Sequence, residues 1–287
     1  MNTSTKPATL SNKKKTPGDL LRRGLSGSVF VLLTVGAMFG GGWWLFMYLM
    51  LACIITTVEF ATLWNEKLQV GMRSLMLVLG ATSHGLVALA LMGSLPMRWL
   101  LAVPAMVSLP LLYAVAVSKP ESLMGAIVAQ FGLVYLAFSL ALLHYPLHHT
   151  GGVAHPWPLL GPVLIIWAND TGAYLIGRKL GRTPLNPRLS PRKTREGALG
   201  GALSAMLVGA ALAHQFREVS PMLWMMFALV LSLTANLGDL FESAIKRYLQ
   251  VKDSGRIMPG HGGLLDRLDA MIFSAPFILL FWGMMGA

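Results

Sequence analysis

Long apolar runs, separated by short polar gaps, are the feature that most limits how this chain of 287 residues can fold. A helix needs about 20 apolar residues to cross the hydrocarbon core of a bilayer, and several of the runs reach that length. Hydrophobic residues make up 55% of the sequence and charged residues only 12%, which is too apolar for a soluble domain. We therefore predict an all-α polytopic membrane helix bundle with about nine transmembrane helices, at residues 25–39, 43–63, 74–95, 99–117, 123–143, 157–176, 197–213, 222–237 and 268–285.

The glycine run at 40–42 is either a turn between two helices or a weak point in one long helix, and the basic residues favour the turn. If the run is a turn, alternate crossing places 21 of the 23 Lys and Arg residues on one side, leaving only Arg98 and Arg217 opposite. Without the turn, the split is 15 to 8. Because Lys and Arg concentrate in cytoplasmic loops, we expect a multi-pass protein of the inner (cytoplasmic) membrane with a cytoplasmic N-terminus. Ala287 is then expected on the other side.

The positions of the charged residues and of the single cysteine limit the classes of function. The net charge of +11 comes from basic residues in the gaps between apolar runs, where membrane topology places them, so nucleic-acid binding is not expected. Cys53 lies inside an apolar run, and one cysteine forms neither an intrachain disulfide nor a cysteine-based metal site. We divide the chain into a basic cytoplasmic tail (1–24), an N-terminal transmembrane scaffold of five helices (25–156) and a C-terminal transmembrane catalytic region of four helices (157–287). Apart from Glu59 and the tail, nearly all candidate reactive groups lie in the third region.

Carboxylates mark both ends of the long charged loop at 238–267. Asp239 and Glu242 are three residues apart on the expected helical continuation of the eighth run. Asp266 and Asp269 repeat this spacing where the ninth run begins, so each pair shares a helix face. A carboxylate at a membrane edge is costly unless it is paired or bound to a metal ion, which makes these positions functional candidates. Helix caps or salt bridges explain Glu242 and Asp269 equally well, whereas the places of Asp239 and Asp266, on either side of a glycine turn, favour metal ligation.

Basic residues are interleaved with these carboxylates. Those of the two long loops include Arg192, Lys193, Arg195, Lys246, Arg247, Lys252 and Arg256. They suit phosphate oxygens, and attraction to anionic lipid headgroups is the alternative for each taken alone. A patch that only attracts lipid would avoid acidic neighbours, so the mixture favours a bound polyphosphate with a cation. Asp170, inside the sixth run, and His261, in the glycine turn, are further candidates, although a turn histidine is equally suited to capping local backbone.

Histidines gather on the side opposite to the charged loops. His144, His148, His149 and His155 could bind a transition metal, but a polar surface loop is the simpler interpretation. We therefore assign them no role.

The second charged loop carries a long ordered motif. It runs as Ser243, Lys246-Arg247, Lys252-Asp253, Pro259, His261-Gly262-Gly263 and Asp266-Arg267-Leu268-Asp269. This motif resembles the signature of the phosphatidate cytidylyltransferases, also called CDP-diacylglycerol synthases. The blocks 169–174, 177–178, 189–197 and 238–243 resemble other blocks of that family, whereas the front half resembles it only in hydropathy. Met258 stands where the family has Leu, Ile or Phe, and Arg192 where it more often has Lys, and these changes keep volume and charge respectively.

The resemblance implies that CTP and phosphatidate react to give CDP-diacylglycerol and pyrophosphate, with Mg²⁺ and optionally a second cation. It implies Asp239, Asp266 and Asp269 as metal ligands. The implied catalytic residues are Asp239, Asp266, Lys246, Arg247 and Lys252, and the implied substrate-binding residues are Arg192, Lys193, Ser243, His261, Gly262, Gly263, Asp170 and Thr171. The active site is then expected at the cytoplasmic rim. The expected partners are the two substrates and the lipid bilayer, with no nucleic acid, and a homodimer is one assembly open to such a chain.

Three other functions fit parts of the same pattern. A CTP-dependent lipid kinase would pass the terminal phosphoryl group to a lipid alcohol, and only the motif separates it from a cytidylyltransferase. An ion-coupled membrane transporter also carries carboxylates within its spans, but it would place them near the midplane with matched helix breaks. Here the charges gather at one rim. A non-catalytic relative that binds lipid or scaffolds partners is disfavoured by the intact carboxylates and basic residues.

Overall fold

The computed structural model describes residues 17–149, 155–216, 219–258 and 262–286. Over these residues the chain is mostly helical, with one short hairpin, and this confirms the predicted all-α class. The helices are α1 (Pro17–Phe39), α2 (Gly42–Leu63), α3 (Val70–Leu91), η1 (Met97–Leu101), α4 (Ala102–Val117), α5 (Pro120–Gly132), η2 (Leu133–Phe138), α6 (Ser139–Leu142), α7 (Tyr145–His149), α8 (Trp157–Leu180), α9 (Arg195–Leu212), α10 (Pro221–Tyr248) and α11 (Leu265–Gly286). The strands β1 (Pro184–Asn186) and β2 (Ser190–Thr194) pair antiparallel.

Seven of the described helical segments are long and apolar enough to cross a membrane, so the chain is a multi-pass membrane protein. They are Gly42–Leu63, Val70–Leu91, Met97–Val117, Pro120–His148, Trp157–Leu180, Pro221–Tyr248 and Leu265–Met285. All nine predicted runs fall on helices, but nine spans are not confirmed. The apolar part of α1, Gly24–Phe39, is shorter than a full span, and α9 begins with the charged residues Arg195 and Glu196.

The predicted turn between the first two helices is present. Helix α1 ends at Phe39 and α2 begins at Gly42. Between them Gly41 has φ of 86°, a conformation that glycine adopts without strain. The glycine run is therefore a break, as the distribution of basic residues indicated.

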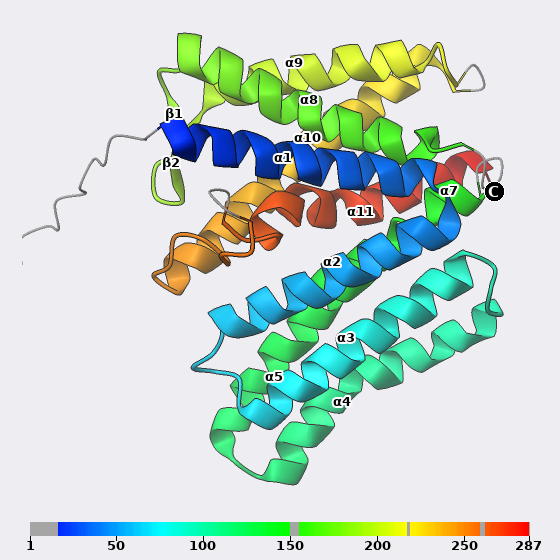
Figure 1. Cartoon of the computed structure of the whole chain (residues 1–287), viewed down its shortest axis with the longest axis vertical. Coiled ribbons are helices and arrows are strands. Elements are labelled where there is room, and N and C mark those ends of the chain that lie inside the picture. Colours follow the sequence, from blue (N-terminus) through cyan, green and yellow to red (C-terminus); the bar gives the residue numbers. More distant parts are fainter. Residues whose placement is uncertain (1–16, 150–154, 217–218, 259–261, 287) are drawn as a thin grey trace, which may run out of the picture.

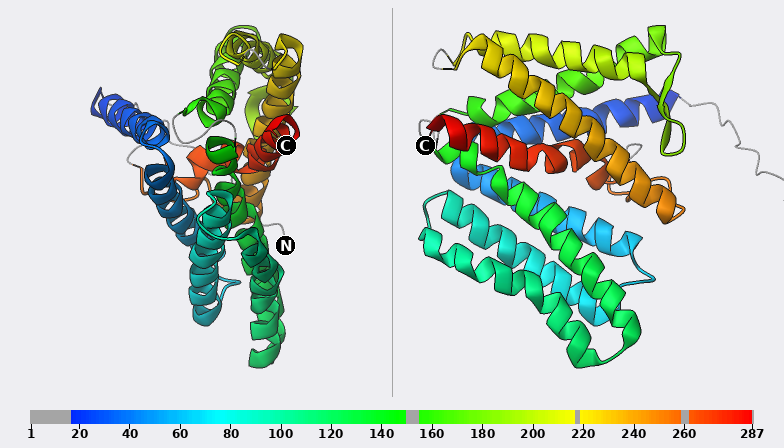
Figure 2. Two further views of the ribbon diagram at one scale, coloured as in Figure 1. Left: turned by 90° about the vertical axis from the view of Figure 1, so that its right-hand side faces the viewer. Right: turned by 180° about the vertical axis from the view of Figure 1, so that it is seen from behind.

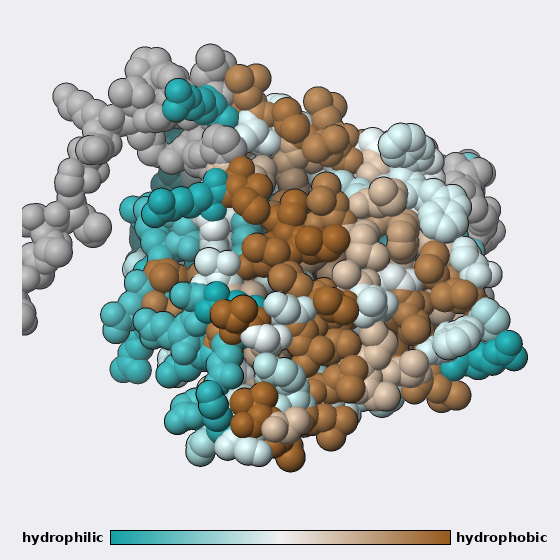
Figure 3. All heavy atoms as spheres, turned by 60° about the horizontal axis from the view of Figure 1, so that its bottom comes forward, coloured by the Kyte–Doolittle hydropathy of each residue, from teal (hydrophilic) through white to brown (hydrophobic). Residues whose placement is uncertain are grey.

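Figure 1 shows α8, α9, α10 and α11 packed together, with α1 running beside them and α2 to α5 forming the rest of the bundle. Seen from behind in Figure 2, α10 crosses α9 and α11 obliquely. The start of α1, the hairpin, the end of α10 and the start of α11 lie at one edge, and the C-terminus lies at the opposite edge. Hydrophilic side chains gather on one side of the molecule in Figure 3, beside a broad hydrophobic band.

Aromatic side chains join α10 to α11 at the ends far from the charged edge. Trp224 is fully buried and lies 5.3 Å from Phe281 and 5.8 Å from Trp282, measured between ring centroids. Phe227 stacks on Phe281 at 3.8 Å. The indole of Trp282 also donates a hydrogen bond of 2.8 Å to the carbonyl oxygen of Pro158 in α8. Because this cluster fixes the two helices against each other, it also fixes the carboxylates at their other ends.

Helix α9 approaches α8 closely because small residues line the contact. A Cβ built on Gly201 would lie 2.7 Å from the carbonyl oxygen of Asn169, closer than real Cβ atoms come. Membrane helices pack through small residues in this way, since lipid supplies no hydrophobic force that drives them together. The close contact places the hairpin, which joins α8 to α9, over the charged edge.

Candidate active site

The two carboxylates predicted as metal ligands come together in space. Asp239 on α10 and Asp266 in the first turn of α11 both line a central cavity of about 570 Å³. They also both line a smaller rim cavity of about 250 Å³, together with Glu242 and Asp269. The spacing of three residues on each helix thus turns four carboxylates toward one region, as the sequence predicted.

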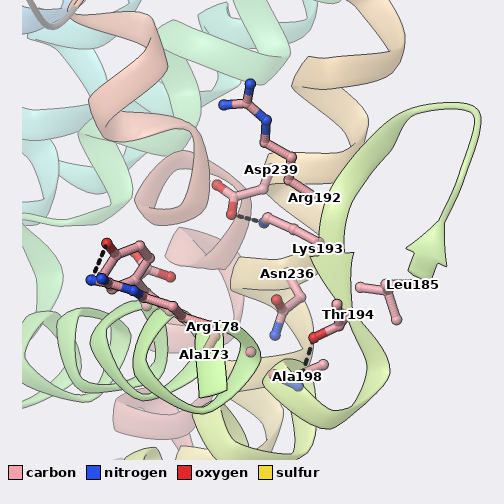
Figure 4. Close-up of a pocket in the computed structure, with 13 residues that line it drawn as sticks. Ala173, Arg178, Leu185, Arg192, Lys193, Thr194, Ala198, Asn236 and Asp239 are labelled. Atoms are coloured by element: carbon pink, nitrogen blue, oxygen red, sulfur yellow. Dashed lines mark hydrogen bonds and ion pairs between the residues drawn. The ribbon is translucent and has the colours of Figure 1, made fainter. Parts of the chain in front are cut away.

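The β1–β2 hairpin supplies a basic wall to the site. The segment was predicted to be a loop, but strands form at Pro184–Asn186 and Ser190–Thr194, and Thr194 then caps α9 through a hydrogen bond of 3.1 Å from the amide of Gly197. Lys193 on β2 reaches Asp239 and forms an ion pair with its carboxylate (Figure 4). The hairpin therefore brings one lysine to a carboxylate of α10.

A third cavity, of about 400 Å³, has this ion pair in its lining (Figure 4). We call it the hairpin cavity; its polar lining comes from Asp170, Tyr174, Arg178, Arg192, Lys193, Thr194, Asn236 and Asp239. Asp170 and Asp239 line both the hairpin cavity and the central cavity. These two carboxylates therefore stand where the two cavities meet.

Lys246 bridges two helices of the site. Its ammonium nitrogen lies 2.6 Å from Glu242 on its own helix and 2.5 Å from Oδ1 of Asp266 on α11. The other oxygen of Asp266, Oδ2, accepts hydrogen bonds from the amides of Ser254 (3.0 Å) and Gly263 (2.9 Å). The salt bridge considered for Glu242 is thus present, and Asp266 is held from both sides.

Asn169 ties Asp170 to α10. The side chain of Asn169 is fully buried, and its Oδ1 accepts hydrogen bonds from Ser232 (2.7 Å) and Asn236 (3.4 Å). Its Nδ2 donates to Asp170 at 3.2 Å. Asp269 is also buried, and its Oδ1 accepts a hydrogen bond of 2.8 Å from the amide of Ala270. Asn169 is thus held by α10, whereas Asp170 and Asp269 each accept a hydrogen bond from a neighbour in their own helix.

The other predicted residues divide into two groups. Ser243 lines the rim cavity, Thr171 the central cavity and Arg192 the hairpin cavity, while Gly262 and Gly263 lead into α11 beside Asp266. Arg247 and Lys252 are exposed and line none of these three cavities. His261 lies outside the described residues.

Among the residues missed as site candidates are four with a charged or amide side chain. Arg178 and Asn236 line the hairpin cavity, Asp253 lines the rim cavity, and Arg267 lines both the central and the rim cavities. The signal for Arg178 was its spacing of eight residues from Asp170, which places both on one face of α8. The signal for Arg267 was its position in the sequence between two acidic candidates, Asp266 and Asp269.

Glu196 anchors the hairpin at its base. Its carboxylate accepts hydrogen bonds from the amides of Arg182 (3.1 Å) and Thr183 (3.2 Å). Together with the backbone amide of Glu196 itself, these bonds lower the pKa of Glu196 to about 2. The hairpin that carries Lys193 is therefore clamped by an ionised carboxylate near neutral pH.

The donor set of the site suits a hard divalent cation. Carboxylate oxygens are the ligands that Mg²⁺ prefers, and two of these carboxylates already attract the ammonium groups of Lys193 and Lys246. The Oε1 atom of Glu242 is buried without a hydrogen-bond partner. Among the described residues no three His, Cys, Asp or Glu side chains stand ready as a ligand group.

The histidine cluster differs from the predicted surface loop. His144 is fully buried, with its ring centroid 5.7 Å from that of His84 and 5.9 Å from that of Phe46. The prediction of a polar surface loop is wrong for His144. The residues that follow it form α7, which packs against α11, instead of an exposed loop. His155 is exposed, as expected.

Comparison with known proteins yields a family and several relatives. The model of the cytidylyltransferase family matches residues 21–285. Similar proteins include the phosphatidate cytidylyltransferases of Staphylococcus aureus (strain COL) and Staphylococcus epidermidis, each 46% identical over 122 residues, and that of Staphylococcus saprophyticus, 43% identical over 122 residues. Each of these matches covers 42% of this chain and 46% of the relative. The match thus spans a little under half the length of these relatives.

Proposed function

The chain belongs to the cytidylyltransferase family, and on this premise we propose that it transfers the cytidylyl group of CTP to phosphatidate, giving CDP-diacylglycerol and pyrophosphate for phospholipid synthesis. The names of the Staphylococcus relatives support this choice of substrates. The structural observation that carries it is the meeting of two unlike cavities at Asp170 and Asp239. The hairpin cavity carries three basic side chains, Arg178, Arg192 and Lys193, which suit the phosphates of a nucleotide. The central cavity combines four aspartates, which suit a cation, with an apolar wall that suits a lipid.

The hairpin cavity is the proposed CTP site. Arg178, Arg192 and Lys193 surround it and offer cationic donors for phosphate oxygens. The hairpin that lines it lies at the charged edge of the molecule, where a water-soluble nucleotide would arrive (Figure 1). We place this edge and the N-terminus on the cytoplasmic side, because the basic residues concentrate there.

The central cavity is the proposed site of the lipid phosphate. Its apolar walls come from Phe30, Val31, Val163, Ile166, Trp167 and Met271. The acyl chains can remain in hydrocarbon while the phosphate headgroup reaches Arg267 and the proposed cation among the aspartates at the polar end. A neighbouring cavity of about 550 Å³ between α1, α2 and the loop before α11 is lined almost entirely by apolar side chains and suits an acyl chain.

The chemistry requires two anions to approach each other. A phosphate oxygen of phosphatidate attacks the α-phosphorus of CTP, a new P–O bond forms, and the P–O bond to the β-phosphate breaks to release pyrophosphate. The attacking oxygen is already negatively charged, so no strong general base is needed. The residues of this chain act by orienting the two substrates and by offsetting negative charge. Lys193 and Lys246 are poised for this, since each can exchange its carboxylate partner for a phosphate oxygen.

We propose Mg²⁺ as the cofactor, held by Asp239 and Asp266 with Asp269 in support, while the identity of any second cation is left to experiment. When bound, Mg²⁺ neutralises the triphosphate and stabilises the leaving pyrophosphate. Removal of divalent cations with EDTA should abolish turnover, and added Mg²⁺ should restore it. Activity that survives EDTA would contradict this assignment.

The decisive experiment follows the label from CTP. Detergent-purified protein receives Mg²⁺, phosphatidate and CTP labelled at the α- or the γ-phosphorus, and the organic phase is counted. Label from the α position supports cytidylyl transfer. Label from the γ position would identify a CTP-dependent lipid kinase, for which diacylglycerol replaces phosphatidate as the control acceptor, and absence of both labels would refute the proposal.

A further inference from the structure

Glu59 lies near the end of α2, in the half of the chain that otherwise supplies scaffold. Its side chain is only 4% exposed. The carboxylate accepts hydrogen bonds from the amides of Leu264 (3.0 Å) and Leu265 (2.8 Å), more than 200 positions later in the sequence. These amides stand at the start of α11, where backbone N–H groups have no partner within the helix. A buried carboxylate from the scaffold therefore serves as the external cap of α11.

The loop before α11 closes around this carboxylate. A Cβ built on Gly255 would clash with Oε1 of Glu59, and a Cβ on Gly263 would lie 2.8 Å from Oε2. The loop thus approaches Glu59 at two points where only glycine leaves room. Glu59 is enclosed by backbone, with none of the site's lysines among its hydrogen-bond partners.

The same turn carries Asp266. The amide of Gly263 donates to Asp266, and the next two amides, of Leu264 and Leu265, donate to Glu59. Two carboxylates therefore hold three consecutive amides, and a shift of this turn moves the carboxylate of Asp266. Negative charge near the start of a helix is also favourable, because the helix dipole is positive there.

We propose that Glu59 is a positioning residue, which holds the first turn of α11 so that Asp266 is in place for a divalent cation. This inference rests on the proposed function for the role of the cation. It assigns a role in the site to a charged residue of α2, in the region that was predicted to be mainly scaffold. A residue that supports a metal ligand from behind typically changes metal affinity by 10- to 100-fold when it is altered.

The test compares Glu59→Gln with Glu66→Gln. Glu66 is exposed in the turn after α2, so it is a matched control for the loss of one carboxylate. Mn²⁺ binding to the purified protein is measured by electron paramagnetic resonance without substrates, and amide hydrogen exchange is measured over residues 262–268. For Glu59→Gln we expect Mn²⁺ affinity to fall about tenfold and exchange at the start of α11 to rise about tenfold. Glu66→Gln should match the wild type in both.

Wild-type Mn²⁺ affinity in Glu59→Gln would overturn the proposal, whether or not exchange increases, because a cap without influence on the site is merely structural. If Glu59→Gln does not fold, Glu59→Asp decides: it keeps the charge but shortens the reach, and we expect about threefold weaker Mn²⁺ binding. Unchanged affinity in Glu59→Asp would refute the inference in that case. These measurements use neither CTP nor lipid. A negative result in the label-transfer assay would therefore refute the proposed function without deciding whether Glu59 positions Asp266.

Discussion

Lys246 offers the sharpest test of how the site holds its charges. Its ammonium lies 2.5 to 2.6 Å from two carboxylates, and its side chain is only 14% exposed. The side chains of its partners Glu242 and Asp266 are 4% and 9% exposed. Substitution Lys246→Met keeps the length of the side chain but leaves two buried carboxylates facing each other without a cation.

The expected cost follows from that burial. Removing one partner of a buried ion pair typically destabilises a protein by 3–5 kcal/mol, because the remaining charge is left uncompensated. Asp266 keeps two backbone hydrogen bonds after the change, whereas Glu242 keeps no backbone hydrogen bond to its carboxylate among the described residues, so we expect about 3 kcal/mol, mostly from Glu242. The measurement is the free energy of unfolding in mixed detergent micelles. Lys67→Met, at an exposed lysine after α2, should change it by less than about 0.5 kcal/mol.

A double-mutant cycle separates this reasoning from a simple packing effect. Adding Glu242→Gln to Lys246→Met removes the stranded charge and should restore about 1.5 kcal/mol or more. A loss below about 1 kcal/mol in the single mutant, or no recovery in the double mutant, would show that these carboxylates are not held by Lys246.

Three further predictions address the reaction, the far side and the hairpin. Asp266→Asn removes charge without changing size, so cytidylyl transfer should fall by at least about a hundredfold while circular dichroism shows an intact fold; near-normal activity would remove Asp266 from the metal site. His148→Ala combined with His149→Ala should change activity by less than about twofold, since both lie on α7, away from the charged edge, and a large loss would contradict the assigned sidedness. The pKa of Glu196 lies below its ordinary value of 4.5, at about 2, so its clamp on the hairpin is complete above pH 4.5 and should weaken as the pH falls toward 2. Hydrogen exchange of the hairpin amides should report this loss, and Glu196→Gln should remove the pH dependence.

Helix positions were predictable because the apolar runs are long and the breaks between them are chemically marked. The turn at Gly41 followed from charge counting alone, and the helical continuation of α10 through Asp239 and Glu242 was expected. The extent of that continuation was not: α10 runs to Tyr248, into the segment predicted as the long loop 238–267. The number of membrane-spanning helices was less predictable, because a helix such as α9 is mostly apolar but begins with charged residues. Hydropathy gives no rule for which of these helices crosses completely.

Contacts between distant segments could not be predicted in the same way. The partner of Lys193 depends on a hairpin whose strands are only three and five residues long and whose residues, rich in Pro and Arg, carry little strand preference. Glu59 stood out as a charge in an apolar run, but its partners are backbone amides, which every residue possesses. Such a contact leaves no pattern in the sequence.

The placement of the charges at one rim has a physical cause that also separates an enzyme from a transporter. Within a continuous helix each backbone amide is already bonded to a carbonyl, so it cannot stabilise a carboxylate. Irregular backbone at the rim has amides without a partner in a helix, and here such amides donate hydrogen bonds to the carboxylates of Glu59, Asp266 and Glu196. A site built from anionic side chains and bare amides can therefore form where loops meet helix ends, whereas a midplane site would require broken helices. A rim site lets a soluble nucleotide and a membrane lipid meet, which the proposed reaction between CTP and phosphatidate requires.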